Sequence, residues 1–257
     1  MRDHRYVAVL GSPCTGDIFL KEGETFSRTR LRLVLFQGRT SFPSMVSPGL
    51  QPEEYALAGG AGATPRMQWC LRMLRDEIDK AHVKRLRGAA KLIDGLVIDN
   101  ISAFEFPHAM TAEQRVFLRS NDWATNVTAR VKLKERYLWE CEIGLSVAAL
   151  SQFLDSMLEL NPSLAILFHC PRPMFNDGIT FDDERVTGNV DFYREYCDRL
   201  YEAAVSRCPK VAVLPQRAAI LADPSHSNGA NPFHFEETYS TGARLDVERI
   251  LGLPAAA

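Results

Sequence analysis

Small and polar residues follow the first apolar run of the chain in a pattern that could support nucleophilic chemistry. The run Tyr6–Leu10 leads into Gly11, and Ser12 and Cys14 come directly after it. A hydroxyl at the end of a strand can act as a nucleophile, and backbone N–H groups at the start of a following helix can stabilise an anion. Cys14 is an alternative nucleophile, since a thiol at a helix N-terminus has a lowered pKa. A plain turn, in which Ser12 only caps a helix, is the simpler alternative.

A carboxylate and an imidazole stand close together near the other end of the chain. Asp223 and His226 are three residues apart in a segment rich in turn-forming residues. At this spacing the carboxylate can bond one ring nitrogen and leave the other to act as a base towards a nucleophile such as Ser12. His234 is an alternative base, although its position between two phenylalanines is also typical of a buried core histidine. Incidental polar residues in a loop are the simpler alternative for the whole segment.

Two further turns carry residues that could bind a substrate or an oxyanion. Gly38 and Arg39 follow the second apolar run; the glycine permits close approach of the backbone, and the arginine offers a planar fork to a carboxylate or phosphate. Asn100 follows the third run, where its amide could donate to an oxyanion or merely form an Asx turn. Histidines 169, 226 and 234 lack the spacing typical of metal ligands, so we expect no metal and no cofactor.

Five short apolar runs predict the buried strands that must position these residues. They span residues 6–10, 31–36, 95–99, 164–169 and 211–214. Helical periodicity falls between them, at 67–86, at 137–160 and after Asn189, a candidate N-cap. Strands that alternate with helices predict an α/β fold, a three-layer α/β/α sandwich with a central, mostly parallel sheet of about five strands. In such sheets ligands bind beyond the carboxyl ends of the strands, where the candidate residues stand.

Length, charge and cysteine use narrow the class of protein further. The chain has 257 residues, a net charge of −2 and 46% hydrophobic residues, which fits one domain over residues 1–257. Stretches 47–65 and 177–188 are predicted to be loops, either lids or plain connectors. The charge favours neither nucleic acid nor an anionic membrane as a partner. We see no secretion signal and no run of about 18 apolar residues, and six dispersed cysteines predict reduced thiols, so we expect a cytoplasmic protein.

Taken together, the motifs resemble those of the SGNH-like (GDSL-like) serine hydrolases. The likeness is to an uncharacterised branch with an N-terminal Gly-Ser-Cys-type motif and a C-terminal Asp-x-x-His motif. The segments that carry it are Gly11-Ser12-Pro13-Cys14-Thr15-Gly16-Asp17-Ile18-Phe19, residues 38–45, Arg72 with Asp76 and Lys80, residues 96–99, and Asp223-Pro224-Ser225-His226 through Pro232-Phe233-His234-Phe235 to Tyr239.

The resemblance implies an SGNH-hydrolase-like fold with Ser12 as nucleophile, His226 as base and Asp223 as its partner. It implies an esterase, a deacylase or an O-acyltransferase for an acyl ester of a small molecule or a carbohydrate. This branch tends to be associated with polysaccharide biosynthesis. The N–H groups of Ser12 and Gly38, with Asn100, would then bind the oxyanion.

In that mechanism, Arg39 would bind an acidic part of the substrate. Two alternatives stay open. Acyl transfer could run through Cys14. The chain could also be a degenerate module that binds a glycan or a protein without turnover, which the segment Ser102-Ala103-Phe104-Glu105 favours, since the branch usually has an Asp-Glu-Arg cluster there.

Overall fold

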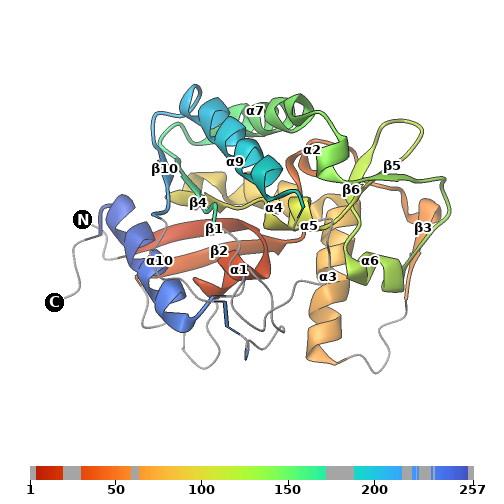
Figure 1. Cartoon of the computed structure of the whole chain (residues 1–257), viewed down its shortest axis with the longest axis horizontal. Coiled ribbons are helices and arrows are strands. Elements are labelled where there is room, and N and C mark those ends of the chain that lie inside the picture. The colour runs from red at the N-terminus through yellow and green to blue at the C-terminus, as the bar shows by residue number, and fades with distance from the viewer. Residues whose placement is uncertain are drawn as a thin grey trace.

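A five-stranded parallel sheet lies at the centre of the molecule (Figure 1). The computed structural model describes residues 4–19, 30–58, 64–171, 188–215, 222, 223, 225, 233 and 235–253. The strands are β1 (Arg5–Gly11), β2 (Leu31–Gly38), β4 (Gly95–Ile98), β9 (Ala165–Phe168) and β10 (Val211–Val213), in the order β10-β9-β4-β1-β2. These are the five runs predicted to be strands, and the α/β class is confirmed.

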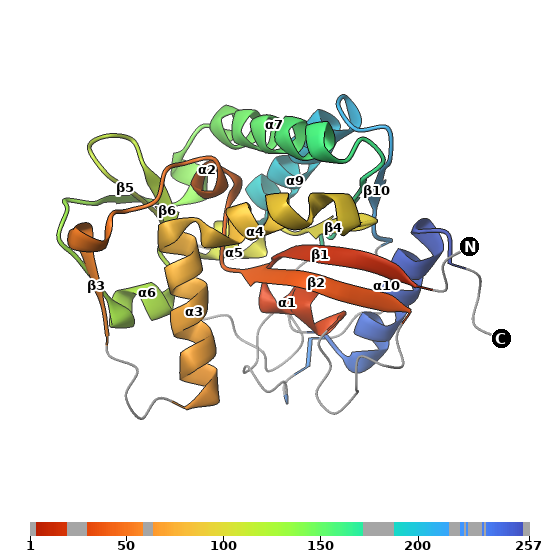
Figure 2. The ribbon, with the colours of Figure 1, turned by 180° about the vertical axis from the view of Figure 1, so that it is seen from behind.

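Helices cover both faces of the sheet and complete three layers (Figures 1 and 2). One face carries α4 (Ala81–Ala89), α7 (Ile143–Leu160) and α9 (Val190–Val205), and the other carries α1 (Pro13–Asp17) and α10 (Glu237–Ile250). The inner strands β4 and β9 are apolar and buried along their length because helices cover both faces, whereas the edge strand β2 exposes Arg32 and Val34. Side chains such as Val97 in β4, Leu154 in α7 and Leu200 in α9 are completely buried in one core.

The helix predicted at 67–86 is two helices. The first, α3, spans Pro65–Asp79, and α4 begins at Ala81, because Lys80 between them has a left-handed backbone with φ of 56°. Such a conformation ends a right-handed helix. Met67, predicted to lie on the buried face, is 45% exposed, whereas Met73 is buried.

The other two predicted helices differ from the structure mainly at their starts. Only a 3₁₀ turn, η4 (Leu138–Glu140), precedes α7, which begins six residues after the predicted start at residue 137. Asn189 does precede α9, but its side chain makes no capping hydrogen bond to that helix. In the described part of the chain α7 alone is long and apolar enough to cross a membrane by length and composition. Leu150 and Phe153 on its inner face are buried in the core, as expected for a core helix.

A second group of short elements lies at one side of the sheet, at the right of Figure 1. There β3 (Tyr55–Leu57) pairs with β7 (Val127–Ala129), and β5 (His108–Met110) lies between β6 (Val116–Leu118) and β8 (Lys134–Arg136), all antiparallel. The helices α2 (Phe42–Met45), α3, α5 (Ile101–Glu105) and α6 (Asn121–Asn126) accompany them, with the 3₁₀ turn η2 (Pro52–Glu54). A further 3₁₀ turn, η3 (Ala90–Leu92), directly follows α4. The stretch 47–65, predicted to be a loop, thus contains a strand; residues 59–63 within it, and 177–187 of the second predicted loop, lie outside the described residues.

Candidate active site

Ser12 lies where the connections of the sheet change direction. The chain passes from β1 outward to β2, then crosses back over β1 to β4 on its other side. Ligands of open parallel sheets bind in the crevice that this reversal leaves at the carboxyl ends of the strands. Ser12 follows β1 directly, Gly38 ends β2 in register with Gly11, and Asn100 comes two residues after β4. The structure therefore brings three of the predicted site residues to the ends of three adjacent strands.

The side chain of Ser12 is buried and bonded to Asp99. Both the backbone N–H and the hydroxyl of Ser12 donate to Asp99 Oδ2, at 2.7 and 3.0 Å. Ser12 occupies the N-cap position of α1, but its side chain does not cap that helix, so the helix-capping alternative is wrong. The N–H group expected to help bind an oxyanion is engaged by the carboxylate.

Asp99 is built tightly into the crevice, although sequence reasoning gave it no role. Its Oδ1 accepts the N–H of Ile101 at 2.9 Å, so the Asx turn considered for Asn100 is made by Asp99 instead. A side chain at Gly11 would collide with this carboxylate, which explains the glycine at the end of β1. Burial raises the pKa of Asp99, and hydrogen bonds from Thr15, Ser12 and Ile101 oppose that rise.

Two amide side chains in the crevice have unused hydrogen-bonding atoms. Asn100 is buried, and its Nδ2 has no partner in the described part of the chain. Gln37, at the end of β2, donates from Nε2 to the carbonyl of Gly38 at 2.9 Å, while its Oε1 is buried without a partner among the described residues. Buried polar atoms without partners are rare in proteins and are often explained by a ligand or water. The Asn100 amide thus remains a candidate oxyanion donor.

Arg39 already has a carboxylate partner in this structure. It forms an ion pair with Asp122 of α6, and its guanidinium lies 5.9 Å from the centre of the Trp69 ring. Its backbone is left-handed, with φ of 58°, which turns the chain sharply after β2. An acidic substrate group would have to share or displace Asp122 to bind Arg39.

Cys14 is a poor candidate nucleophile. Burial, followed by the nearby charges of Asp99, Asp17 and Glu105, raises the pKa of its thiol well above the ordinary value. This is the opposite of the lowering expected at a helix N-terminus. The thiol is protonated at neutral pH, and a protonated thiol is a weak nucleophile.

His169 is a second buried group that sequence reasoning left without a role. It directly follows β9; Nδ1 lies 2.5 Å from Thr15 Oγ1, and Nε2 lies 2.5 Å from the hydroxyl of Tyr239 on α10. Burial lowers the pKa of His169 to about 3, so the ring is neutral. Asp99 and His169 share one signal that could have found them, because each is the polar last residue of a predicted strand. Among the described residues, no group of three or more His, Cys, Asp or Glu side chains could hold a metal ion.

The predicted base and its partner lie in the segment before α10. His226 and His234 lie outside the described residues. Asp223 is described, and its Oδ1 accepts the backbone N–H and the hydroxyl of Ser225 at 2.8 and 2.7 Å. The contact between Ser12 and His226 therefore stays a prediction.

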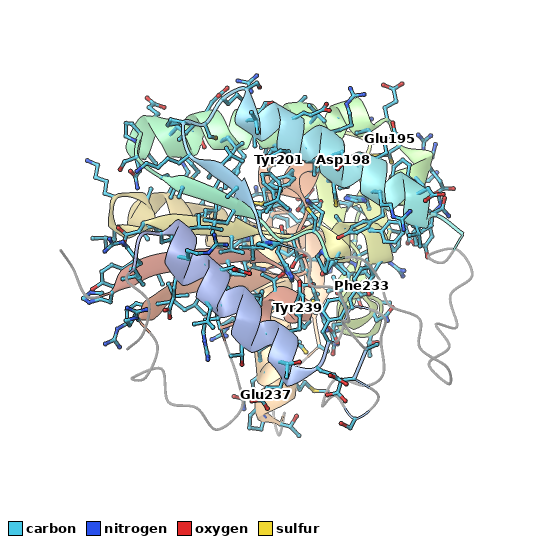
Figure 3. All side chains as sticks on the ribbon, turned by 60° about the vertical axis from the view of Figure 1, so that its left-hand side comes forward. Glu195, Asp198, Tyr201, Phe233, Glu237 and Tyr239 are labelled. Atoms are coloured by element: carbon cyan, nitrogen blue, oxygen red, sulfur yellow. The ribbon has the colours of Figure 1, made fainter. Side chains whose placement is uncertain are left out.

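Aromatic residues anchor this segment to the core. Ala222 and Phe235 form an antiparallel bridge across its base. The buried Phe233 packs edge-on against Tyr193 of α9 at 5.8 Å, and Phe235 packs against Tyr239 at 4.6 Å. Figure 3 shows Phe233 and Tyr239 inside the molecule, near the start of α10. Phe233 and Phe235 thus lie against residues of α9 and α10.

Comparisons with known proteins give only weak likenesses. No family model matches the sequence, and no curated protein matches it. A solved structure from Parabacteroides merdae, described as a GDSL-like lipase, is 12% identical with a TM-score of 0.47, over 98% of this chain and 97% of that one. A family two carbohydrate esterase from Clostridium thermocellum, in complex with cellohexaose, is 14% identical with a TM-score of 0.41, over 97% of this chain and 65% of that one. An acetyl xylan esterase from the rumen bacterium Butyrivibrio proteoclasticus is 14% identical with a TM-score of 0.38, over 97% and 64%. The chain spans about two thirds of the two esterases, and none of the three likenesses carries an argument about activity.

Proposed function

We propose that this protein is a serine hydrolase or acyltransferase that acts on an acyl ester through Ser12. The observation that carries the proposal is the position of Ser12, at the reversal point of the sheet with its hydroxyl oriented by a buried carboxylate. The raised pKa of Cys14 supports Ser12 over the thiol as the nucleophile at neutral pH.

In the proposed reaction His226 takes the proton of Ser12 as the serine oxygen attacks the acyl carbonyl. The imidazolium is stabilised by Asp223, and it returns the proton to the leaving alcohol as the ester bond breaks. The Asn100 amide, whose Nδ2 has no partner among the described residues, and the N–H of Gly38 stabilise the oxyanion. Loss of one such donor costs about 10²–10³ in turnover. The acyl group then passes from Ser12 to water in an esterase, or to a sugar hydroxyl in an O-acyltransferase. Acyl esters of carbohydrates are the substrate class that the motif resemblance favours.

One observation favours a second candidate, a module that binds a glycan or a protein without turnover. The hydroxyl and the N–H of Ser12 are both bonded to Asp99. The hydrogen bond from the Ser12 hydroxyl to Asp99 must break before a histidine can accept the proton of that hydroxyl.

Labelling with a fluorophosphonate serine probe separates the two candidates. Intact-mass spectrometry with peptide mapping should find one adduct on Ser12 in the wild type and in Cys14→Ala, and none in Ser12→Ala or His226→Ala. No adduct on the folded wild-type protein would contradict the hydrolase and favour the binding module. An adduct that survives Ser12→Ala but not Cys14→Ala would move the chemistry to the thiol.

A further inference from the structure

A continuous chain of buried hydrogen bonds leads from Ser12 to α10. Ser12 donates to Asp99 Oδ2, and the hydroxyl of Thr15 lies beside the same carboxylate and lowers its pKa. Thr15 is bonded to His169 Nδ1, and Nε2 of the same ring is bonded to the Tyr239 hydroxyl. All five residues are at most 5% exposed. The hydrogen-bond chain joins residues that follow β1 and β4 to His169, which follows β9, and to Tyr239 on α10.

The number of protons in this hydrogen-bond chain limits which group can donate to which. An ionised Asp99 only accepts, so Thr15 donates to it and must accept from His169. His169 is neutral, with one ring proton, which then sits on Nδ1. Nε2 is left bare and accepts the proton of Tyr239. The opposite order, with the proton on Nε2, requires that Asp99 supply a proton of its own.

The backbone around Asp99 favours the ionised form. The N–H groups of Ser12 and Ile101 both point at the carboxylate, and an N–H group cannot accept a proton from a carboxylic acid. The other titratable groups near Asp99 are Cys14 on α1, Tyr193 on α9 and His169, which follows β9. The pKa values of the thiol and the phenol are raised and that of His169 is lowered, so all three are uncharged at neutral pH.

We propose that Asp99 is a positioning residue for Ser12, and that Tyr239, His169 and Thr15 form a one-way hydrogen-bond chain that holds Asp99 as a carboxylate. The part that concerns Ser12 rests on the proposed function, whereas the order of protons does not. Tyr239 also packs against Phe235, so the hydrogen-bond chain links Ser12 to a tyrosine that contacts Phe235.

The tautomer of His169 tests the order of protons without any catalysis. Long-range ¹H–¹⁵N spectra, with the signals assigned by their loss in His169→Gln, should show a neutral ring protonated on Nδ1 in the wild type. Thr15→Val removes the acceptor, and a buried donor without a partner is unfavourable, so the proton should move to Nε2 and bond Tyr239. A wild-type ring protonated on Nε2 would overturn the proposal.

Tyr201→Phe provides a matched control for the tyrosine. Tyr201 lies on α9 and packs against Phe168, the residue before His169, but it is not part of the hydrogen-bond chain (Figure 3). Tyr239→Phe should slow labelling of Ser12 about 10-fold, since it removes the last donor, whereas Tyr201→Phe should leave the His169 tautomer and the labelling rate as in the wild type. Equal effects of the two substitutions would contradict the chain.

Asp99→Asn tests the link to Ser12 and separates this inference from the proposed function. We expect the maximal rate of fluorophosphonate labelling to fall on the order of 10²-fold, because the serine oxygen is misplaced, while the probe concentration at half-maximal rate stays unchanged. An unchanged maximal rate would overturn the positioning role. If His169 carries its proton on Nδ1 but the wild type is not labelled, the chain stands and the proposed function fails. If the wild type is labelled while the proton sits on Nε2, the proposed function stands and the chain fails.

Discussion

At the scale of single residues, the candidate site was predictable in part. The positions of Ser12, Gly38 and Asn100 follow from one rule, that carboxyl ends of parallel strands meet at one edge of the sheet. The partner of Ser12 does not follow from any rule of this kind. Asp99 ends an apolar run in the sequence, and its contact with Ser12 joins residues 87 positions apart. Such a pair depends on the register of β1 and β4, which short apolar runs do not specify.

Gly11→Ala tests how tightly the Asp99 carboxylate is packed. The added methyl group would collide with Oδ2 and with the carboxyl carbon, so Asp99 must move. We expect the free energy of unfolding to fall by about 1–3 kcal/mol, as for other overpacked sites, and labelling of Ser12 to slow on the order of 10²-fold. Urea denaturation and probe kinetics measure the two effects.

A second glycine supplies the control for this prediction. A side chain at Gly88 in α4 would meet no atom within 4 Å. Gly88→Ala should therefore stabilise the protein by about 0.5–1 kcal/mol, through helix propensity alone, and leave labelling unchanged. Normal labelling of Gly11→Ala would show that Asp99 can move without cost to Ser12.

At the scale of elements, a buried polar cluster explains why the predicted helix breaks at Lys80. The Lys80 amino group donates to Ser44 Oγ on α2 and to the carbonyl of Val116 on β6. Glu77 accepts from Ser44 as well, and from the backbone N–H of Leu118 at 2.9 Å. Apolar periodicity runs through residue 80 without interruption, so nothing in the pattern marks the break. It arises because α3 must turn away once its last turn has reached α2 and β6.

Glu77→Ala should destabilise the protein by about 3–5 kcal/mol, because it leaves the Lys80 ammonium buried without its carboxylate. Burial already lowers the pKa of Lys80 to about 8, and Glu77 opposes that change. Thermal unfolding and urea denaturation at pH 7 measure the loss. The exposed Glu159 on α7 is the control: Glu159→Ala should stay within about 0.5 kcal/mol of the wild type. Similar small effects of both substitutions would show that the cluster adds little to stability.

At the scale of the whole molecule, the central sheet was predictable and the elements beside it were not. The core strands form short, mostly apolar runs, and the inner strands β4 and β9 are buried on both faces; such runs stand out in a sequence. Strands β3, β5, β6, β7 and β8 have three residues each, too few to show a period. They hold together through contacts between distant segments, such as the buried cluster of Leu50, Leu74, Ile78, Phe117 and Trp123.

The central sheet and the short elements beside it both enclose neutral histidines. We therefore expect the free energy of unfolding to fall at acidic pH. Burial lowers the pKa of His169 to about 3 and that of His108 to about 4, and it also lowers the pKa of His82. In the unfolded chain histidine titrates near 6.5. Between about pH 4 and 6.5 the unfolded chain binds more protons than the folded one, so stability rises with pH in this window and is lost on acidification.

His108 gives this prediction its sharpest form, because neither ring nitrogen has a hydrogen-bond partner among the described residues. A pKa of about 4 against about 6.5 in the unfolded chain corresponds to about 2 kcal/mol of lost stability at pH 5 and almost none at pH 7.5. The free energy of unfolding, measured by urea denaturation, should fall by about 2 kcal/mol less between pH 7.5 and pH 5 in His108→Leu than in the wild type. Met110→Leu, on the same strand, should keep the wild-type drop. An unchanged drop in His108→Leu would mean that His108 is protonated in the folded protein at pH 5, with a counter-charge or water beside β5.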